Sequence, residues 1–389
     1  MSTLPKILVI VGPTASGKSN LAIKIAKYLN SEYKVIARPY ILMGAEIVSA
    51  DSRQIYRGMD IGTAKPPRDL ARPNDKQIKT NGKRKFDKNS VSFDYYSSGI
   101  RHHLIDIKNP NEEYTVAQYK KDCLRVIRRI LKRKKLPILV GGTGLYVKAV
   151  VENLEIPKVK PNSKLRKKLE KELKSKGVNY LYQKLIKLDP EAAYIVDPKN
   201  PRRIIRALEI TIKTNKPFSK QRKSGKKLFD ALKIGIDLPK AKLKKRIDKR
   251  VDEMMRLGLM HETKELIKRY PPKFETDSKN RIRGTFEKKY NPAFDAIGYR
   301  EIIDYLSADK HRLKARINAD NKIRVNPRSH QRESAALEEA VGLIKNNTWR
   351  YAKRQITWFK KDKEIEWMKN ANDFFKLAKK RGTLLREPR

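Results

Sequence analysis

A glycine-rich segment near the start of the chain constrains its fold most strongly. Residues 7–11 are a continuous aliphatic run, and Gly12–Ser19 directly after it has the pattern G-x-x-x-x-G-K-[ST]. The run predicts a strand buried on both faces of a parallel sheet, and the pattern predicts a loop whose backbone N–H groups surround phosphate oxygens where a helix begins. Lys18 supplies a cation, and the Ser19 hydroxyl is a potential Mg²⁺ ligand. A nucleotide such as ATP is the default ligand of this loop, but the pattern does not specify which phosphates bind.

Strand and helix patterns alternate along the chain. Further apolar runs at 45–50, 136–140 and 232–236 predict strands, and an amphipathic helix is expected over 115–135. This βαβ series predicts an α/β fold, with a P-loop NTPase-like parallel sheet flanked by helices and a mainly helical inserted domain.

Changes in composition suggest three parts. We expect residues 1–157 to form the first part of the catalytic core, 158–230 the helical insertion, and 231–389 the rest of the core with the C-terminal helices. Three segments are polar, basic and poor in aliphatic residues, which is typical of insertions without a core of their own. They span about 68–98, 271–290 and 307–328.

The charge of the chain points to a polyanionic partner. Its 389 residues include 92 Lys and Arg against 43 Asp and Glu, a net charge of +49. Such a field attracts nucleic acid, although a general lysine bias of the source proteome explains part of the excess. The sole cysteine, Cys123, excludes a disulfide framework and a cysteine metal site. With no signal-peptide pattern and no apolar run of about 18 residues, we expect a cytoplasmic protein that does not enter a membrane.

Two candidate catalytic side chains follow predicted strands. Asp51 comes directly after the second strand, where open parallel sheets place their chemistry, and could hold Mg²⁺ through water or accept a proton. The alternative is a helix N-cap. Thr143 lies among three glycines after the next strand, which would let the backbone approach a ligand closely and place a hydroxyl beside the phosphates. A plain strand-to-helix turn is the alternative there.

Two basic helices are further candidates. Arg202 or Arg203 lies on one helical face with Arg206, a spacing that suits phosphodiester contacts. Residues 244–250 carry a stripe of five basic side chains that could bind a diphosphate. A solvated helix face is the alternative for both.

Eight segments together resemble the tRNA dimethylallyltransferase family, also called tRNA isopentenyltransferases or IPP transferases. They occur in the family's order over almost the whole chain: Gly12–Ser19, Ser49–Tyr56, Gly58–Pro66, His103–Asp106, Val140–Tyr146, Asn200–Glu209, Ala296–Arg300 and Lys353–Trp358. The resemblance implies an enzyme that transfers the dimethylallyl group of dimethylallyl diphosphate to a tRNA. The acceptor would be N6 of the adenosine immediately 3′ of the anticodon (position 37), flipped out of its stack in the anticodon stem-loop. The products would be N6-isopentenyladenosine and diphosphate, Mg²⁺ would assist, and the enzyme would be a monomer.

The resemblance also implies roles for individual residues. Asp51 would be the catalytic base, and Thr143 and Arg250 would act with it. Ser19 would hold the metal. The diphosphate would lie on Gly12, Pro13, Thr14, Ala15, Ser16, Gly17, Lys18 and Ser19. The tRNA would contact Asp51, Ser52, Arg53, Gln54, Thr143, Arg166, Arg202, Arg203, Ile204, Ile205, Arg206, Gly298, Tyr299 and Arg300.

The chain departs from the family pattern in three respects, and three other functions stay open. Residues 33–44 look like an extra piece, residues 68–98 and 307–328 look longer and more basic than the family's usual connections, and the C-terminal zinc finger of eukaryotic members is absent. An adenylate isopentenyltransferase would share the loop and the base but modify a free nucleotide. A small-molecule or polynucleotide kinase would use the loop for ATP, and a non-enzymatic RNA-binding protein could share the charge.

Overall fold

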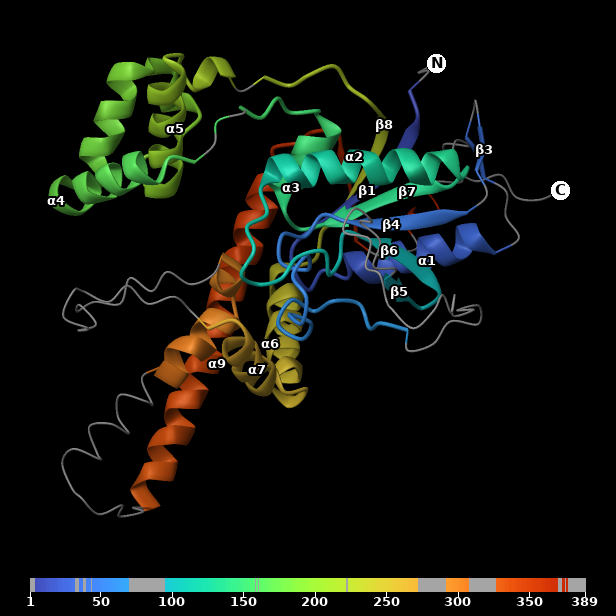
Figure 1. Ribbon diagram of the computed structural model, residues 1–389. Helices are drawn as coiled ribbons and strands as arrows, with labels where there is room; N and C mark the ends of the chain where they lie inside the picture. Colours follow the sequence, from blue (N-terminus) through green and yellow to red (C-terminus); the bar gives the residue numbers. More distant parts are fainter. Residues whose placement is uncertain are drawn as a thin grey trace, which may run out of the picture. The chain divides into compact units, whose positions relative to one another are not determined.

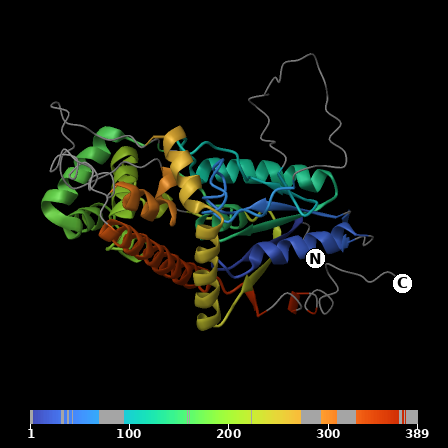
Figure 2. The same ribbon diagram turned by 90° about the horizontal axis from the view of Figure 1, so that it is seen from below.

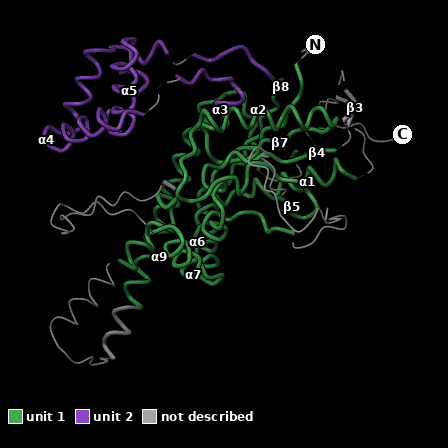
Figure 3. Tube along the Cα trace, viewed as in Figure 1, with its two compact units in different colours: residues 1–147, 229–389 green, residues 148–228 purple. Residues whose placement is uncertain are grey.

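Two compact units make up the computed structural model. It describes residues 4–31, 35–37, 40–42, 44–69, 95–157, 159, 161–221, 223–271, 292–307, 327–369, 373, 374 and 376. Unit 1 comprises Met1–Val147 and Phe229–Arg389, and unit 2 comprises Lys148–Leu228 (Figure 3). Unit 2 and the expected insertion share residues 158–228. Unit 2 starts ten residues before the expected insertion, at Lys148, which lies within helix α3, Gly144–Val151.

A seven-stranded sheet forms the centre of unit 1. Its order is β5-β6-β4-β7-β1-β8-β9, and every neighbouring pair is parallel except β5 with β6. The expected parallel sheet is confirmed. The strands are β1 Lys6–Val11, β4 Ala45–Ser49, β5 Tyr95–Ser97, β6 Ile100–His103, β7 Leu136–Gly141, β8 Asp230–Ile236 and β9 Ile365–Met368. Strands β2 Val35–Ala37 and β3 Tyr40–Leu42 pair separately as an antiparallel ladder, within the segment that looked like an extra piece.

Helices cover both faces of this sheet. Helix α1, Lys18–Asn30, and helix α2, Val116–Lys132, lie on opposite faces (Figures 1 and 2). Buried Leu21 and Ile25 of α1 pack in one core with Leu8 of β1. The remaining helical segments of unit 1 are α6 Lys240–Arg256, α7 Leu259–Arg269, η3 Pro292–Asp295, a helix over 299–307, and α9 Pro327–Phe359. None of the helices in the described ranges has the length and apolarity needed to cross a membrane.

The register of three strands brings the candidate site together. Val11 of β1 lies opposite Gly141 of β7, and Val140 lies opposite Ser49 of β4. The loops that follow these strands therefore begin side by side at the carboxyl edge of the sheet, where parallel sheets bind ligands. A second core supports that edge: Met59 from the loop after β4 packs with α6, α7 and the helix over 299–307.

The predicted basic insertion at 68–98 is corrected at its end. Residues 70–94 lie outside the described part of the chain, but Tyr95–Ser97 is a strand that pairs with β6. Ser98 and Gly99 have φ of 54° and 76°, the conformation of a tight hairpin turn, and both N–H groups donate to the Asp69 carboxylate at 2.8 Å. The Ser-Gly pair in the sequence was therefore a hairpin signal.

The other two predicted insertions fall mostly outside the described residues. Of 271–290, only residue 271 is described. Of 307–328, residue 307 lies in the preceding helix, and residues 327 and 328 begin α9, so the described ends of that segment are helical rather than irregular.

Unit 2 is mainly helical, as expected. It contains α4 Ser163–Leu188, η1 Pro190–Tyr194, α5 Pro201–Thr214 and η2 Ser219–Gln221. Gly177, at φ 80°, bends α4 so that Leu169 and Leu181 both reach one core. Asn162 and Asn200 cap the two helices by accepting hydrogen bonds from Leu165 N and Arg203 N.

The glycines at and after the end of β7 are also required for packing. Their predicted role, to let the backbone approach a ligand, stays a prediction, and Gly141 lines the cavity described below. A Cβ at Gly141 would lie 2.1 Å from the carbonyl oxygen of Ala50, and one at Gly144 would lie 2.1 Å from Nε1 of Trp358 in α9. These glycines let β4 and α9 approach the strand end closely.

We expect Gly141→Ala to lower the free energy of unfolding by about 2 kcal/mol or more, because the backbone of β4 must move to admit the methyl group. Urea unfolding measures the change. Gly342→Ala in α9 is the matched control: nothing lies within 4 Å of its Cβ position, and alanine is favoured in a helix by about 1 kcal/mol. A Gly141→Ala protein as stable as the control would contradict this account of the strand contact.

Candidate functional site

The loop between β1 and α1 has the backbone shape of an anion site. Gly12 and Gly17 have φ of 153° and 94°, and Ser16 N donates to Pro13 O at 3.2 Å, which rounds the loop. Gly17 stands at the N-cap of α1 with no side-chain cap. The first N–H groups of the helix therefore have no intrahelical partner, and the positive end of the helix dipole lies where a phosphate would bind.

Lys18 is half-buried beside this loop. Its Nζ donates to Pro13 O at 3.2 Å. Burial is the main cause that lowers the pKa of Lys18 to about 8. The positive charge of Arg250 also lowers this pKa, whereas the Asp51 carboxylate partly raises it again. An anion bound here would favour the charged amine.

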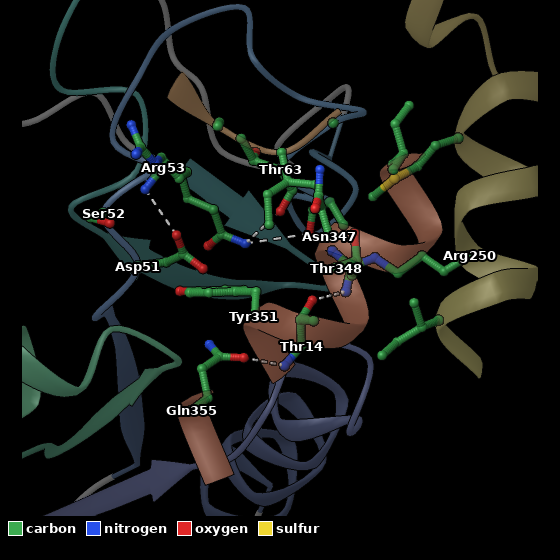
Figure 4. Close-up of a pocket in the computed structure, with 18 of the residues that line it drawn as sticks. Thr14, Asp51, Ser52, Arg53, Thr63, Arg250, Asn347, Thr348, Tyr351 and Gln355 are labelled. Carbon is green, nitrogen blue, oxygen red and sulfur yellow. Dashed lines mark hydrogen bonds between the residues drawn. The ribbon is translucent and has the colours of Figure 1, made fainter. Parts of the chain in front are cut away.

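Two arginines of the predicted basic stripe on α6 reach the same loop. Arg250 Nη1 donates to Thr14 Oγ1 at 3.1 Å, and Arg246 Nη1 donates to Ser16 O at 3.3 Å (Figure 4 shows Arg250 and Thr14). Burial lowers the pKa of Arg250, and Asp51 opposes that shift. The loop thus has three cationic side chains close to it.

Asp51 and Thr143 lie at the ends of neighbouring strands. Asp51 Oδ1 accepts from Arg53 N at 2.9 Å and so caps a turn; the segment that follows is a series of turns, not the helix that the alternative interpretation required. Thr143 Oγ1 accepts from Ser52 N at 3.0 Å, and Thr143 N donates to Ala50 O at 3.2 Å. Thr143 therefore fixes the backbone directly after Asp51.

A cavity of about 510 Å³ opens over these residues. Nine of the predicted site residues line it: Thr14, Lys18, Ser19, Asp51, Ser52, Arg53, Gln54, Arg250 and Arg300. Thr143 borders it indirectly, through Ser52 and through a hydrogen bond with the Tyr351 hydroxyl. Ser19 and Asp51 bring a hydroxyl and a carboxylate to the same space, both of them oxygen donors of the type that Mg²⁺ prefers.

One face of α9 forms a wall of the cavity that the sequence reasoning missed. Asn347, Thr348, Tyr351 and Gln355 recur at helical spacing along it (Figure 4). Burial raises the pKa of Tyr351 to about 12, and the nearby Asp51 charge acts in the same direction. Lys353–Trp358 stood out in the sequence only as a family motif. The polar positions every three or four residues were the available signal that this helix faces a site.

Glu262 on α7 was also missed, and it fixes the loop that forms another side of the cavity. Its carboxylate accepts from the N–H groups of Asp60, Ile61 and Gly62 at 2.9–3.2 Å. The Tyr299 hydroxyl donates to it at 2.6 Å. No local pattern distinguishes Glu262 from the other charged residues of α7, because its partners lie about 200 residues away in the chain.

The Gly298–Arg300 segment is divided between the core and the cavity. The Tyr299 ring is fully buried, and a Cβ at Gly62 would lie 2.4 Å from it. Gly298 N donates to Glu301 Oε2 at 2.8 Å. Only Arg300 of the three lines the cavity as the structure describes it.

The predicted tRNA-binding residues of unit 2 have contrasting surroundings. Glu209, which is fully buried, accepts from Arg166 Nη2 at 2.9 Å and Arg206 Nη1 at 2.6 Å. Ile204 and Ile205 pack in the core of the unit. Arg202 and Arg203 are exposed at the start of α5. Arg202 and Arg203 are therefore the most accessible of the predicted tRNA-binding residues in unit 2.

We expect the affinity for inorganic diphosphate to fall as the pH rises above about 8. Lys18 is charged in the free protein below its pKa and neutral above it, and the bound anion favours the charged form. Binding above pH 8 must therefore take up a proton, which weakens it by up to about tenfold per pH unit. Calorimetric titration, corrected for ionisation of the ligand, measures this. In Lys18→Met, binding should be weaker and this dependence absent; the same dependence in both proteins would contradict the assignment.

We expect Glu262→Gln to loosen the loop at residues 60–62. An amide has one acceptor oxygen and turns an NH₂ group toward backbone donors, which costs about 0.5–1.5 kcal/mol for each hydrogen bond lost at this half-buried site. Hydrogen exchange at Asp60, Ile61 and Gly62 should become faster. Glu265→Gln, an exposed carboxylate on the same helix, is the control. Unchanged protection in Glu262→Gln would show that these hydrogen bonds do not hold the loop.

Comparison with known proteins identifies the family of this chain. The family described as IPP transferase matches residues 93–362. A tRNA dimethylallyltransferase of Pelotomaculum thermopropionicum is 37% identical over 369 residues, which cover 94% of this chain and 91% of the relative. One of Acetivibrio thermocellus is 37% identical over 374 residues, with coverage of 95% and 93%.

Solved structures give the same answer. The tRNA isopentenylpyrophosphate transferase of Bacillus halodurans is 32% identical, with a TM-score of 0.54 over 97% of this chain and 95% of that one. A eukaryotic dimethylallyltransferase acting on tRNA is 25% identical, with a TM-score of 0.60 over 97% of this chain and 77% of that one. The match to the family and to relatives along nearly their whole length shows that this chain belongs to the IPP transferase family.

Proposed function

We propose that this chain is a tRNA dimethylallyltransferase. It transfers the dimethylallyl group from dimethylallyl diphosphate to N6 of the adenosine immediately 3′ of the anticodon (position 37) and releases diphosphate. The observation that carries the proposal is the placement of Asp51 and a cation-rich phosphate loop around one cavity. The relatives named tRNA dimethylallyltransferase support the same reaction.

The cavity residues have complementary tasks in this reaction. The N6 amine attacks the first carbon of the dimethylallyl group, and the carbon–oxygen bond breaks with its electron pair moving to the diphosphate. Asp51 accepts the proton that leaves N6. Lys18, Arg250 and the N–H groups at the start of α1 stabilise the negative charge that develops on the leaving diphosphate. Thr143 keeps the backbone after Asp51 in place.

Mg²⁺ fits this site through Ser19. Within the described residues, no group of three or more His, Cys, Asp or Glu side chains could hold a metal ion by itself. The Ser19 hydroxyl would therefore hold Mg²⁺ together with diphosphate oxygens, and the bound ion would neutralise part of their charge.

Binding of the tRNA is proposed from charge and exposure. The net charge of +49 favours a polyanion over a free nucleotide such as AMP. Arg202 and Arg203 are accessible for phosphates of the anticodon stem-loop, whereas Arg166 and Arg206 would need to share their donors with Glu209. Ser52, Arg53, Gln54 and Arg300 line the cavity, where a flipped adenosine would enter. A monomeric state and a cytoplasmic location stay predictions.

A single-turnover assay tests the function. Radiolabelled dimethylallyl diphosphate and Mg²⁺ are mixed with an unmodified anticodon stem-loop, a stem-loop with guanosine at position 37, AMP or ATP. Label is expected only in the unmodified anticodon stem-loop. Label on AMP would indicate an adenylate isopentenyltransferase, and hydrolysis of ATP without transfer would indicate a kinase-like use of the loop.

We expect Asp51→Asn to slow transfer by about 10²- to 10⁴-fold, because an amide cannot accept the N6 proton. Diphosphate binding should be kept or become tighter, since a negative charge near Lys18 and Arg250 is removed. Asp230→Asn, an exposed carboxylate at the start of β8, is the control. A full rate in Asp51→Asn would contradict its role as the base.

A further inference from the structure

Gln355 joins two loops of the cavity and uses both ends of its amide to do so. Its Oε1 accepts from Thr14 N at 2.8 Å, and its Nε2 donates to Gly142 O at 2.8 Å (Figure 4 shows the first bond). The residue is only 5% exposed. Because the oxygen and the nitrogen have different partners, the amide has one orientation, with its oxygen toward the phosphate loop.

This contact changes what the phosphate loop can bind. Loops of this kind hold phosphates through their backbone N–H groups. In this loop, three of the residues that follow β1 have no backbone N–H group to offer. Pro13 has no N–H, Thr14 N donates to Gln355, and Ser16 N donates to Pro13 O. The donors left for an anion are Ala15 N and the N–H groups where α1 begins, Gly17–Ser19.

A longer polyphosphate would meet Gln355 at its outer end. We take a phosphate added to an anion at the start of α1 to lie toward Thr14, because Thr14 lines the same cavity and the Arg250 guanidinium contacts it. At Thr14 it meets the Gln355 oxygen, which has lone pairs and no proton to donate. To bind there, a third phosphate must break the Thr14–Gln355 bond and leave the buried Gln355 oxygen without a donor, a loss that buried polar groups resist.

We propose that Gln355 makes the loop selective for diphosphates over triphosphates. The inference rests on the proposed function, in which a diphosphate ester is the substrate. It assigns to Gln355 the exclusion of nucleoside triphosphates, which use the same loop pattern in other proteins. Gln355 is thus a specificity-determining residue rather than a catalytic one.

The approach of α9 that places Gln355 depends on a glycine. A Cβ at Gly142 would lie 2.2 Å from Gln355 Nε2. Gly142→Ala should therefore displace the amide without removing it. This provides a second way to break the Thr14 contact, independent of truncating Gln355.

The test compares the affinities of inorganic diphosphate and inorganic tripolyphosphate by calorimetry. The wild-type protein should bind diphosphate more tightly. In Gln355→Ala, the ratio of the two affinities should shift toward tripolyphosphate by at least about tenfold, and Gly142→Ala should shift it in the same direction. Thr357→Ala, an exposed position on the same helix, should leave the ratio unchanged.

Using a ratio separates selectivity from general damage to the site, which would weaken both ligands alike. If Gln355→Ala does not fold, Gly142→Ala alone decides. A wild-type protein that binds both anions equally, or a ratio unchanged in the folded variants, overturns the proposal. The transfer assay distinguishes a failure of this inference from a failure of the proposed function. Transfer to the stem-loop together with an unchanged affinity ratio rejects only the inference about Gln355. Absence of transfer rejects the proposed function, whatever the affinity ratio.

Discussion

Parallel pairing of β1, β7 and β4 is the constraint on which the rest of the site depends. Because Val11 lies opposite Gly141 and Val140 opposite Ser49, three consecutive strands in the sheet end at the same level. The phosphate loop, Thr143 and Asp51 each follow one of these ends. A shift of one residue in either pairing would turn the strand's side chains to the other face and separate the carboxylate from the cations. Three almost entirely buried strands make such a shift costly.

The second half of unit 1 turns these loops into a rigid site. None of the three strand-end loops is held by its own neighbours alone. Glu262 of α7 binds the backbone of residues 60–62, Arg250 of α6 contacts Thr14, and Gln355 of α9 connects Thr14 with Gly142. Polar side chains from helices late in the chain thus satisfy backbone groups near its start. Arg250 of α6 also acts on Lys18: its charge adds to the effect of burial in lowering the pKa of that amine.

Local sequence patterns predicted the sheet and the loops, but not the helices that hold them. Aliphatic runs located β1, β4, β7 and β8, and glycine spacing located the phosphate loop, because these signals come from neighbouring residues. Gln355 and Glu262 were missed because the backbone groups that they bind lie far away in the chain: 341 and 213 residues for Gln355, and about 200 for Glu262. Arg206 shows the opposite difficulty. Its helical spacing with Arg202 or Arg203 suggested phosphate contacts, whereas in the folded unit the buried Glu209 accepts hydrogen bonds from Arg206 and from Arg166, which only the family resemblance had singled out.

The bond between Thr14 and Gln355 also has a consequence for biosynthesis. The two residues are separated by 341 positions, so at about 5–20 residues per second the ribosome adds Gln355 roughly 20 to 70 s after Thr14. During that interval the nascent sheet can assemble β1, β4 and β7, but the phosphate loop has no amide oxygen on Thr14. A nascent chain would therefore meet cellular anions with a less selective loop than the finished enzyme has. Selectivity in this molecule is therefore acquired late, once α9 has been synthesised and docks on the phosphate loop.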